Sequence, residues 1–136
     1  MEPGAYDIQA RQGTYLKKQI TYSLPDDSGT QQGVDLTGFL ARMKVRKFAK
    51  TDPALLSLDS DTVGTDATGI SWVDRTHGKF RIYVAATVMA TIPEGEWVYD
   101  LELVPPHSPS GYDEPNAFAL LAGVFDVAAE VTWTTP

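Results

Sequence analysis

The sequence contains no cysteine and only two histidines among its 136 residues. Without cysteine the chain can form neither disulfide bonds nor thiolate metal sites, and this composition is typical of proteins that fold in a reducing cytoplasm. His77 and His107 are far apart in the sequence and both lie beside turn residues. Two isolated imidazoles give little support to a zinc site or a catalytic triad. We therefore expect no metal and no cofactor.

Positive charge and long apolar runs are also scarce. The chain has 11 Lys and Arg against 18 Asp and Glu, which gives a net charge of −7. Phosphate attraction needs net or clustered positive charge, so we expect no binding to nucleic acid or to an anionic membrane. No apolar run approaches the roughly 20 residues of a membrane-spanning helix. The N-terminal "MEPGAYDIQ" lacks the basic and apolar regions of a signal peptide, which predicts synthesis in a cytoplasm.

What the chain does have is repeated alternation of apolar and polar residues, which is typical of half-buried strands. The alternating segments are residues 5–11, 19–24, 39–47, 79–85, 96–104 and 124–133. Less regular short strands are expected at 55–58 and 69–73, and the alanine-rich "VAATVMAT" predicts a helical turn near residues 85–91. Turn-forming Pro, Gly, Asp and Ser separate the segments. This pattern predicts one all-β domain over residues 1–136, an antiparallel β-sandwich.

A pair of carboxylates stands out in "GEWVYDLELV", residues 95–104. Asp100 and Glu102 would project from one face of a strand, about 7 Å apart. Glycosidase carboxylates can have this separation, but they line a cleft, and one of them must be kept protonated by apolar surroundings. The acidic loop "DSDTVGTDATGI" does not fit a calcium loop, because Val63 and Ile70 occupy ligand positions. We therefore expect no enzymatic activity and no metal site.

Three tryptophans leave a carbohydrate-binding module open as an alternative, since flat aromatic rings stack on sugar faces. Trp97 and Trp133 fall in phase with the apolar face of their strands, which favours packing in the core. Trp133 lies near the C-terminus and is also a candidate contact residue. Loss of glycan binding on replacement of Trp72 or Trp133 by alanine would favour this alternative.

The order of the motifs supplies a family resemblance. The blocks that carry it are "YDIQARQGTYLKKQITYS", "VDLTGFLARMKVR", "GKFRIYVAATVMATIPEGEWVYDLELV" and "GVFDVAAEVT". This order resembles small β-sandwich proteins and domains of the tail and baseplate of tailed bacteriophages. The resemblance covers most of the chain, except the loops at 25–33, 50–68 and 105–117. It implies an immunoglobulin-like sandwich that is a structural part of the virion, with no catalytic residue to carry over.

The resemblance leaves the position in the particle open. A tail, baseplate, collar or tail-tip adaptor is the leading expectation, made in the host cytoplasm and located in the virion. Its partners would be other virion proteins and copies of itself. A capsid decoration protein and a module for host-surface glycans remain alternatives. The terminal "MEPGA" and "TWTTP" are candidate arms that would become ordered on assembly.

An immunoglobulin-like order places the strand at 39–47 beside the strand at 96–104. We therefore predict a charge ladder across these strands, with an ion pair between a base of the first and an acid of the second. Asp126 and Glu130 should lie on the next strand, where they would repel the acids unless the register offsets them. The hydroxyl of Tyr99 is expected to bond to nearby backbone, as corner tyrosines do. The candidate interface residues are Arg42, Lys44, Arg46, Asp100, Glu102 and Trp133.

Overall fold

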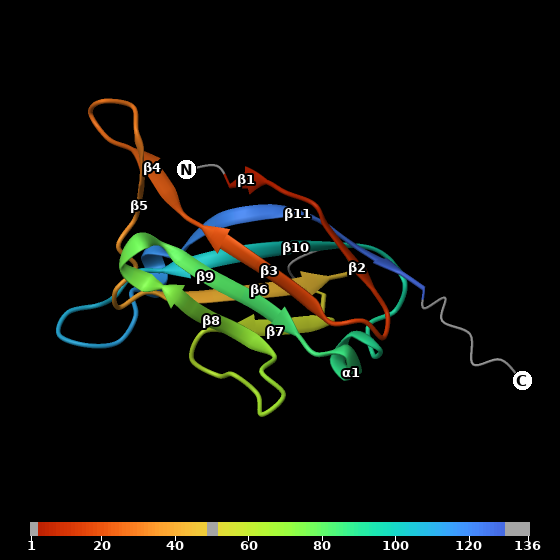
Figure 1. Cartoon of the computed structure of the whole chain (residues 1–136). Helices are drawn as coiled ribbons and strands as arrows, with labels where there is room; N and C mark the ends of the chain where they lie inside the picture. The colour runs from red at the N-terminus through yellow and green to blue at the C-terminus, as the bar shows by residue number, and fades with distance from the viewer. Residues whose placement is uncertain (1–2, 49–51, 130–136) are drawn as a thin grey trace, which may run out of the picture.

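Most of the alternating segments form strands of two sheets that pack face to face (Figure 1). The computed structural model describes residues 3–48 and 52–129. In chain order the elements are β1 (Gly4–Ala5), β2 (Ile8–Arg11), β3 (Leu16–Thr21), β4 (Ser23–Pro25), β5 (Gln31–Gly33), β6 (Leu40–Arg46), β7 (Leu56–Asp59), β8 (Gly69–Asp74), the 3-10 turn η1 (Arg75–His77), β9 (Lys79–Val84), α1 (Ala86–Met89), β10 (Gly95–Val104), the 3-10 turn η2 (Glu114–Asn116) and β11 (Phe118–Ala128).

The strand order confirms the predicted all-β sandwich of immunoglobulin-like type. The larger sheet has β11, β10, β6 and β7 side by side, and the smaller sheet has the order β3-β9-β8. All these neighbours are antiparallel, whereas β1 and β2 pair with β11 in the parallel direction. The helical turn α1 joins β9 to β10 and lies within the range predicted for it. The short strands expected at 55–58 and 69–73 are β7 and β8.

Alternation places one set of side chains between the sheets. The fully buried residues of the central strands include Met43, Val45, Phe80, Ile82, Val84, Leu101, Leu103 and Phe125. Burying each such side chain contributes about 1.5–3 kcal/mol, so this shared core holds the two sheets together. The alternate residues of β6 and β10 face outward, which leaves their charged groups on the surface of the larger sheet.

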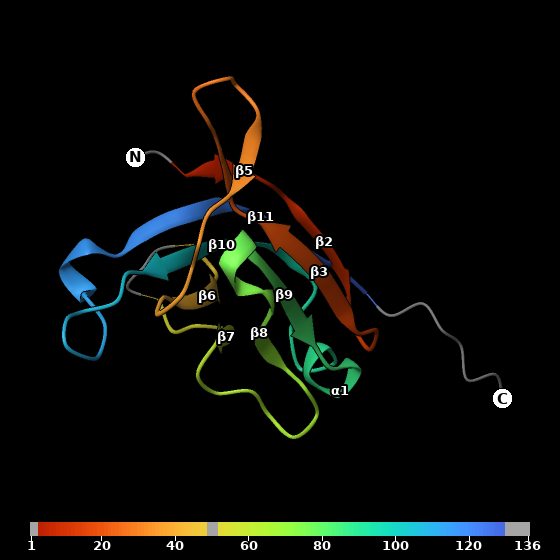
Figure 2. The same ribbon diagram turned by 60° about the vertical axis from the view of Figure 1, so that its left-hand side comes forward.

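The sequence predicted one strand at 19–24, but the structure divides this segment between β3 and β4. β3 begins at Leu16 and ends at Thr21, and the chain then leaves the sandwich as the β4–β5 hairpin, which stands off from both sheets (Figure 2). The cause is tertiary: the Tyr22 N–H donates to the Gly78 carbonyl at 2.8 Å, and the Tyr22 carbonyl accepts from Val34 at 2.9 Å. Leu24, expected in the core, is therefore 50% exposed.

The last strand begins earlier than predicted. β11 runs from Phe118 instead of residue 124, and the sequence missed its first half because alternation fails there. Leu121 pairs with Leu101 and Ala119 pairs with Glu102, so Leu120 is an extra residue in the strand. Such a bulge shifts the side-chain phase by one residue. Trp133 and the rest of the predicted strand beyond residue 129 lie outside the described residues.

The segment at 5–11 is also interrupted, at what we call the Tyr6–Asp7 junction between β1 and β2. Tyr6 donates its N–H to the Ala122 carbonyl at 3.1 Å, and an Asp7 carboxylate oxygen accepts the Val124 N–H at 3.0 Å. The Tyr99 hydroxyl donates to the Tyr6 carbonyl, which confirms the predicted bond from Tyr99 to backbone. Gly4 and Ala5, two of the five residues of the expected N-terminal arm, are thereby held in the larger sheet.

Close approach at this junction requires glycine at position 123. A Cβ atom there would lie 2.4 Å from the Tyr6 carbonyl oxygen and 2.8 Å from an Asp7 carboxylate oxygen. Both distances are shorter than real Cβ contacts allow, so a side chain would force the junction away from β11. Three separate parts of the sequence therefore depend on one another at a single point.

Replacing Tyr99 with Phe tests the hydroxyl. Removing the donor leaves the Tyr6 carbonyl without this bond, which should cost about 1–3 kcal/mol of unfolding free energy. Burial first, and then the nearby Tyr6 and Asp7, raise the pKa of Tyr99 from 10.0 to about 12. Because the folded-state pKa is the higher one, this contribution to stability is complete below pH 10 and is lost as the pH rises from about 10 to about 12.

Urea unfolding of the native chain and Tyr99→Phe across this pH range measures both effects. The variant should lose less stability than the native chain between pH 10 and 12. Tyr15→Phe is the matched control, because Tyr15 is 58% exposed and its removal should change neither quantity. Equal unfolding midpoints for the native chain and Tyr99→Phe at neutral pH would contradict the structural role of the hydroxyl.

Gly123→Ala should detach the N-terminal strands. Overpacking a tight contact typically costs about 1–3 kcal/mol, and here the strain falls between β11 and the Tyr6–Asp7 junction. Amide hydrogen exchange should therefore speed up in β1 and β2, while amides shared by β6 and β10 stay protected. Val124→Ala is the control, since it changes the neighbouring residue without adding atoms to the junction. Uniform exchange across both sheets would rule out this local effect.

Candidate interaction surface

The outward side chains of β6, β10 and β11 form one continuous surface, which we call the charged face. The register fixes the neighbours: Arg42 is opposite Glu102, Lys44 is opposite Asp100, and Arg46 is opposite Val98. On the other side of β10, Ala122, Val124 and Asp126 of β11 are opposite Asp100, Val98 and Glu96. The five charged residues predicted for the ladder are thus brought onto one side of one sheet. Trp133, the sixth candidate interface residue, lies outside the described residues.

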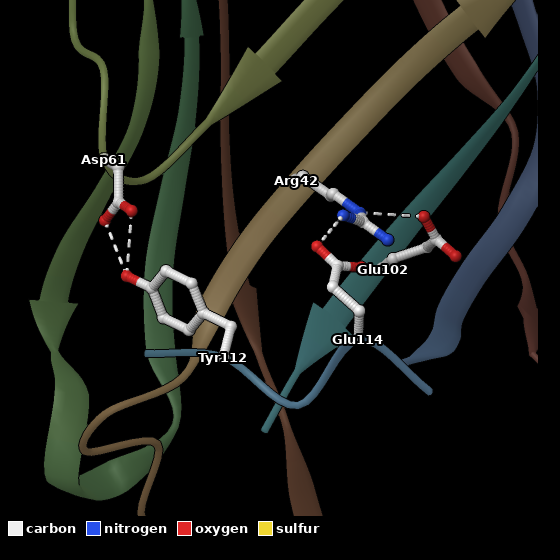
Figure 3. Close-up of polar contacts among 5 residues, drawn as sticks. All are labelled: Arg42, Asp61, Glu102, Tyr112 and Glu114. Atoms are coloured by element: carbon white, nitrogen blue, oxygen red, sulfur yellow. Dashed lines mark hydrogen bonds and ion pairs between the residues drawn. The ribbon is translucent and has the colours of Figure 1, made fainter. Parts of the chain in front are cut away.

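Arg42 confirms the predicted ion pair between the strands. Its Nε lies 3.0 Å from Glu102 Oε1, and its Nη1 lies 2.9 Å from Glu114 Oε1 (Figure 3). The side chains of Arg42 and Glu102 are only 25% and 26% exposed. The hydrogen bonds that Arg42 donates, to Glu114 first and then to Glu102, raise the pKa of Arg42 against the effect of burial. The guanidinium therefore ties β6 to β10 and to the turn η2.

Elsewhere the ladder is not closed. Lys44 and Asp100 are opposite each other, but no ion pair joins them within the described part of the chain. Arg46 instead donates from Nε to the Asp52 carbonyl at 3.2 Å. The register keeps Asp126 from lying opposite Asp100 or Glu102, whose repulsion was predicted, and places it opposite Glu96. That arrangement leaves two acids side by side at one end of β10.

Two loops border this face, and no pattern in the sequence predicts the contacts that they make. Glu114 and Tyr112 belong to the loop at 105–117, which the family resemblance does not cover. The Tyr112 hydroxyl donates to the Asp61 carboxylate at 2.8 Å (Figure 3), and this bond raises the pKa of Tyr112. Asp59 Oδ1 accepts the N–H groups of Asp61 and Thr62 at 2.9 and 2.6 Å. The acidic loop is thus a turn tethered to its neighbour.

Apolar groups interrupt the charges near the end of β6. Phe48 is 80% exposed and Val98 is 39% exposed. They line a shallow depression of about 190 Å³ together with Lys44, Arg46, Tyr99, Asp100 and Ala122. The Phe48 N–H donates to an Asp52 carboxylate oxygen at 2.9 Å. Exposed apolar groups ringed by charges suit the docking of another surface.

The two described tryptophans are engaged in packing. The Arg75 guanidinium lies 4.3 Å from the centre of the Trp72 ring, and Phe80 meets that ring edge-on at 5.8 Å. Trp97 donates from Nε1 to the Pro93 carbonyl at 2.8 Å. Both rings are partly buried against the core. Trp72 therefore holds Arg75, which in turn bonds to the Leu36 and Phe39 carbonyls.

Among the described residues, one ion pair lies away from the charged face. His77 Nδ1 lies 3.0 Å from the Asp74 carboxylate, and this hydrogen bond lowers the pKa of Asp74. Within residues 3–48 and 52–129, no group of three or more His, Asp or Glu side chains is placed to hold a metal ion. Over the same residues, no helix has the length and apolarity to span a membrane.

A double-mutant cycle tests whether register alone makes an ion pair. Arg42→Met and Glu102→Gln should couple by about 0.2–1 kcal/mol in urea unfolding of dilute protein, and less at high salt. Lys44→Met and Asp100→Asn form the matched control, because these residues face each other across the same strands without an ion pair. Their coupling should be near zero. Equal coupling in both pairs would contradict the distinction between them.

The chain matches no protein-family model and no curated protein sequence. Neither comparison therefore assigns it a family or a function. What it does must be inferred from its own residues and their arrangement.

Proposed function

We propose that the chain is a non-enzymatic structural protein of a tailed-phage particle, most specifically a tail, baseplate, collar or tail-tip adaptor. It would dock on other virion proteins and on copies of itself. The observation that carries the proposal is the Tyr6–Asp7 junction. It joins residues from three of the sequence blocks on which the phage resemblance rests: the opening "YDIQ", the "WVYDLEL" of β10 and the "GVFDV" of β11. Motifs distant in the sequence thus serve one shared piece of architecture.

The surfaces support an assembly role. The charged face is broad and shallow, which suits contact with another protein better than it suits chemistry on a small substrate. The β4–β5 hairpin projects from the sandwich with an ordered tip, where Asp26 Oδ1 accepts the N–H groups of Ser28 and Thr30 at 2.8 and 3.0 Å. β7 and β8 end their sheets, and an edge strand can pair with a strand of a neighbour.

A second candidate is a carbohydrate-binding module, favoured by one observation on the smaller sheet. The rings of Tyr15 and Tyr83 stack at a centroid distance of 6.0 Å with 24° between their planes. Tyr15 is well exposed, and Lys17 is opposite Tyr83 on the neighbouring strand. An aromatic pair beside a cation could receive a sugar ring. Because Trp72 packs against the core, this pair is the better surface on which to test glycan binding.

Labelling of particles tests the virion role. Phage particles induced from cells that carry the gene should bind an antibody raised against the recombinant chain, at one defined position in electron micrographs. As the blocking control, particles are first treated with an excess of unlabelled fragments of the same antibody, which should prevent the labelling. Purified particles that lack the chain by both immunogold labelling and peptide mass spectrometry would refute the proposal. In that case, glycan binding that disappears in Tyr15→Ala would support the second candidate instead.

A further inference from the structure

We infer that the charged face is the contact between two copies of this chain, stacked face to face about a two-fold axis that runs parallel to β10. The inference deepens the proposed function and rests on it, because it names the partner of the same face. It is argued from the distribution of charge over three neighbouring strands.

The face is electrically divided along the direction of its strands. Its β6 side presents three bases in succession, Arg42, Lys44 and Arg46, with Lys47 directly after them. Its other side, formed by β10 and β11, presents the acids Glu96, Asp100, Glu102 and Asp126. Bases and acids thus occupy opposite halves of one surface, although the whole chain carries a net charge of −7.

Only some of these charged side chains form ion pairs within one copy. Arg42 is bonded to Glu102 and Glu114. Lys44 and Asp100 form no ion pair among the described residues, and Glu96 stands directly opposite Asp126, another acid. Like charges placed opposite each other across strands are unfavourable. The remaining bases and acids can therefore gain by meeting opposite charges from outside the chain.

Symmetry decides how a second copy can meet this face. A two-fold axis in the plane of contact and parallel to the strands keeps each residue's level along the strand and exchanges the two sides. Because Lys44 and Asp100 share one level in the register, Lys44 of each copy meets Asp100 of the other. Lys47 of one copy comes to the end of the face that holds the Glu96–Asp126 pair of the other. A two-fold axis across the strands would instead place bases on bases.

The apolar part of the face, near the end of β6, is suited to lose water. Val98 and Val124 are opposite each other on β10 and β11, and Phe48 borders the same depression. In the proposed pair, Val98 of one copy lies at the level of Arg46 of the other, whose methylene groups can cover apolar surface. Sheets stacked in this way lie about 10 Å apart, which leaves room for the long basic side chains. Apolar contacts beside ion pairs are a usual combination in protein interfaces.

Two charge reversals and their mixture test the pairing. Lys44→Glu places acid against Asp100 of the other copy, and Asp100→Lys places base against Lys44. Each variant alone should weaken dimerisation by about tenfold or more in sedimentation velocity, because like charges then meet twice in each dimer. In an equimolar mixture both contacts become attractive, so a one-to-one heterodimer should form. Lys17→Glu is the matched control, with the same change on an exposed strand position of the smaller sheet.

The mixture separates contact between copies from any effect within one chain, since each variant retains its own internal defect. Circular dichroism and urea unfolding check that both variants are folded. We expect the native chain to form a reversible dimer that high salt weakens. A native chain that stays monomeric at millimolar concentration, or forms a larger closed assembly, would overturn the inference. So would a dimer no more sensitive to the two reversals than to Lys17→Glu, or a mixture that remains monomeric.

These outcomes are distinguishable from those of the virion experiment. A monomeric chain that is nevertheless found in phage particles would refute this pairing and leave the structural role intact. A dimer of the expected charge dependence that is absent from particles would refute the virion role and leave the pairing intact.

Discussion

The rest of the structure depends on the parallel pairing of the N-terminal strands with β11. A parallel pair cannot be closed by a tight hairpin, so side chains must fix where it forms. Here the Tyr99 hydroxyl holds the Tyr6 carbonyl, the Asp7 carboxylate replaces a backbone acceptor for Val124, and Gly123 leaves room for both. With β2 on one side and β10 on the other, β11 is not an edge strand. The strands that carry the charged face therefore have paired neighbours on both sides, and the register is fixed on both sides of β10.

Much of the fold could be predicted because burial of one face imposes a period of two. β9 has this period throughout, β6 and β10 have it over most of their length, and each strand lies where the sequence pattern placed it. The predictions failed where a distant backbone group decides the local path. Tyr22 turns away because it bonds to Gly78, and the first half of β11 loses its phase at the Leu120 bulge. Contacts of this kind leave no mark on the pattern of the segment itself, because they depend on residues far away in the chain.

The candidate surface was predictable to the same degree. Alternation on β6 and β10, with an immunoglobulin-like order, was enough to predict an ion pair between a base of one strand and an acid of the other, which Arg42 and Glu102 form. The second partner of Arg42 could not be predicted from alternation. Glu114 reaches Arg42 only because the loop at 105–117 folds back, through bonds such as the one from the Asp113 N–H to the Pro105 carbonyl. Register also did not guarantee an ion pair. Arg46 lies opposite Val98, an apolar residue, and bonds to the Asp52 carbonyl instead.

The separation of bases from acids is not something that folding requires. Any polar residue on the outward positions of β6 and β10 satisfies the alternation, and exposed ion pairs add little stability. Mixed signs on each strand would serve the single chain as well, and would avoid placing Glu96 opposite Asp126. What the separation does determine is which surface can dock, because a partner must present the two signs in the reverse order. A copy of the same face, turned about an axis along the strands, presents them in that order.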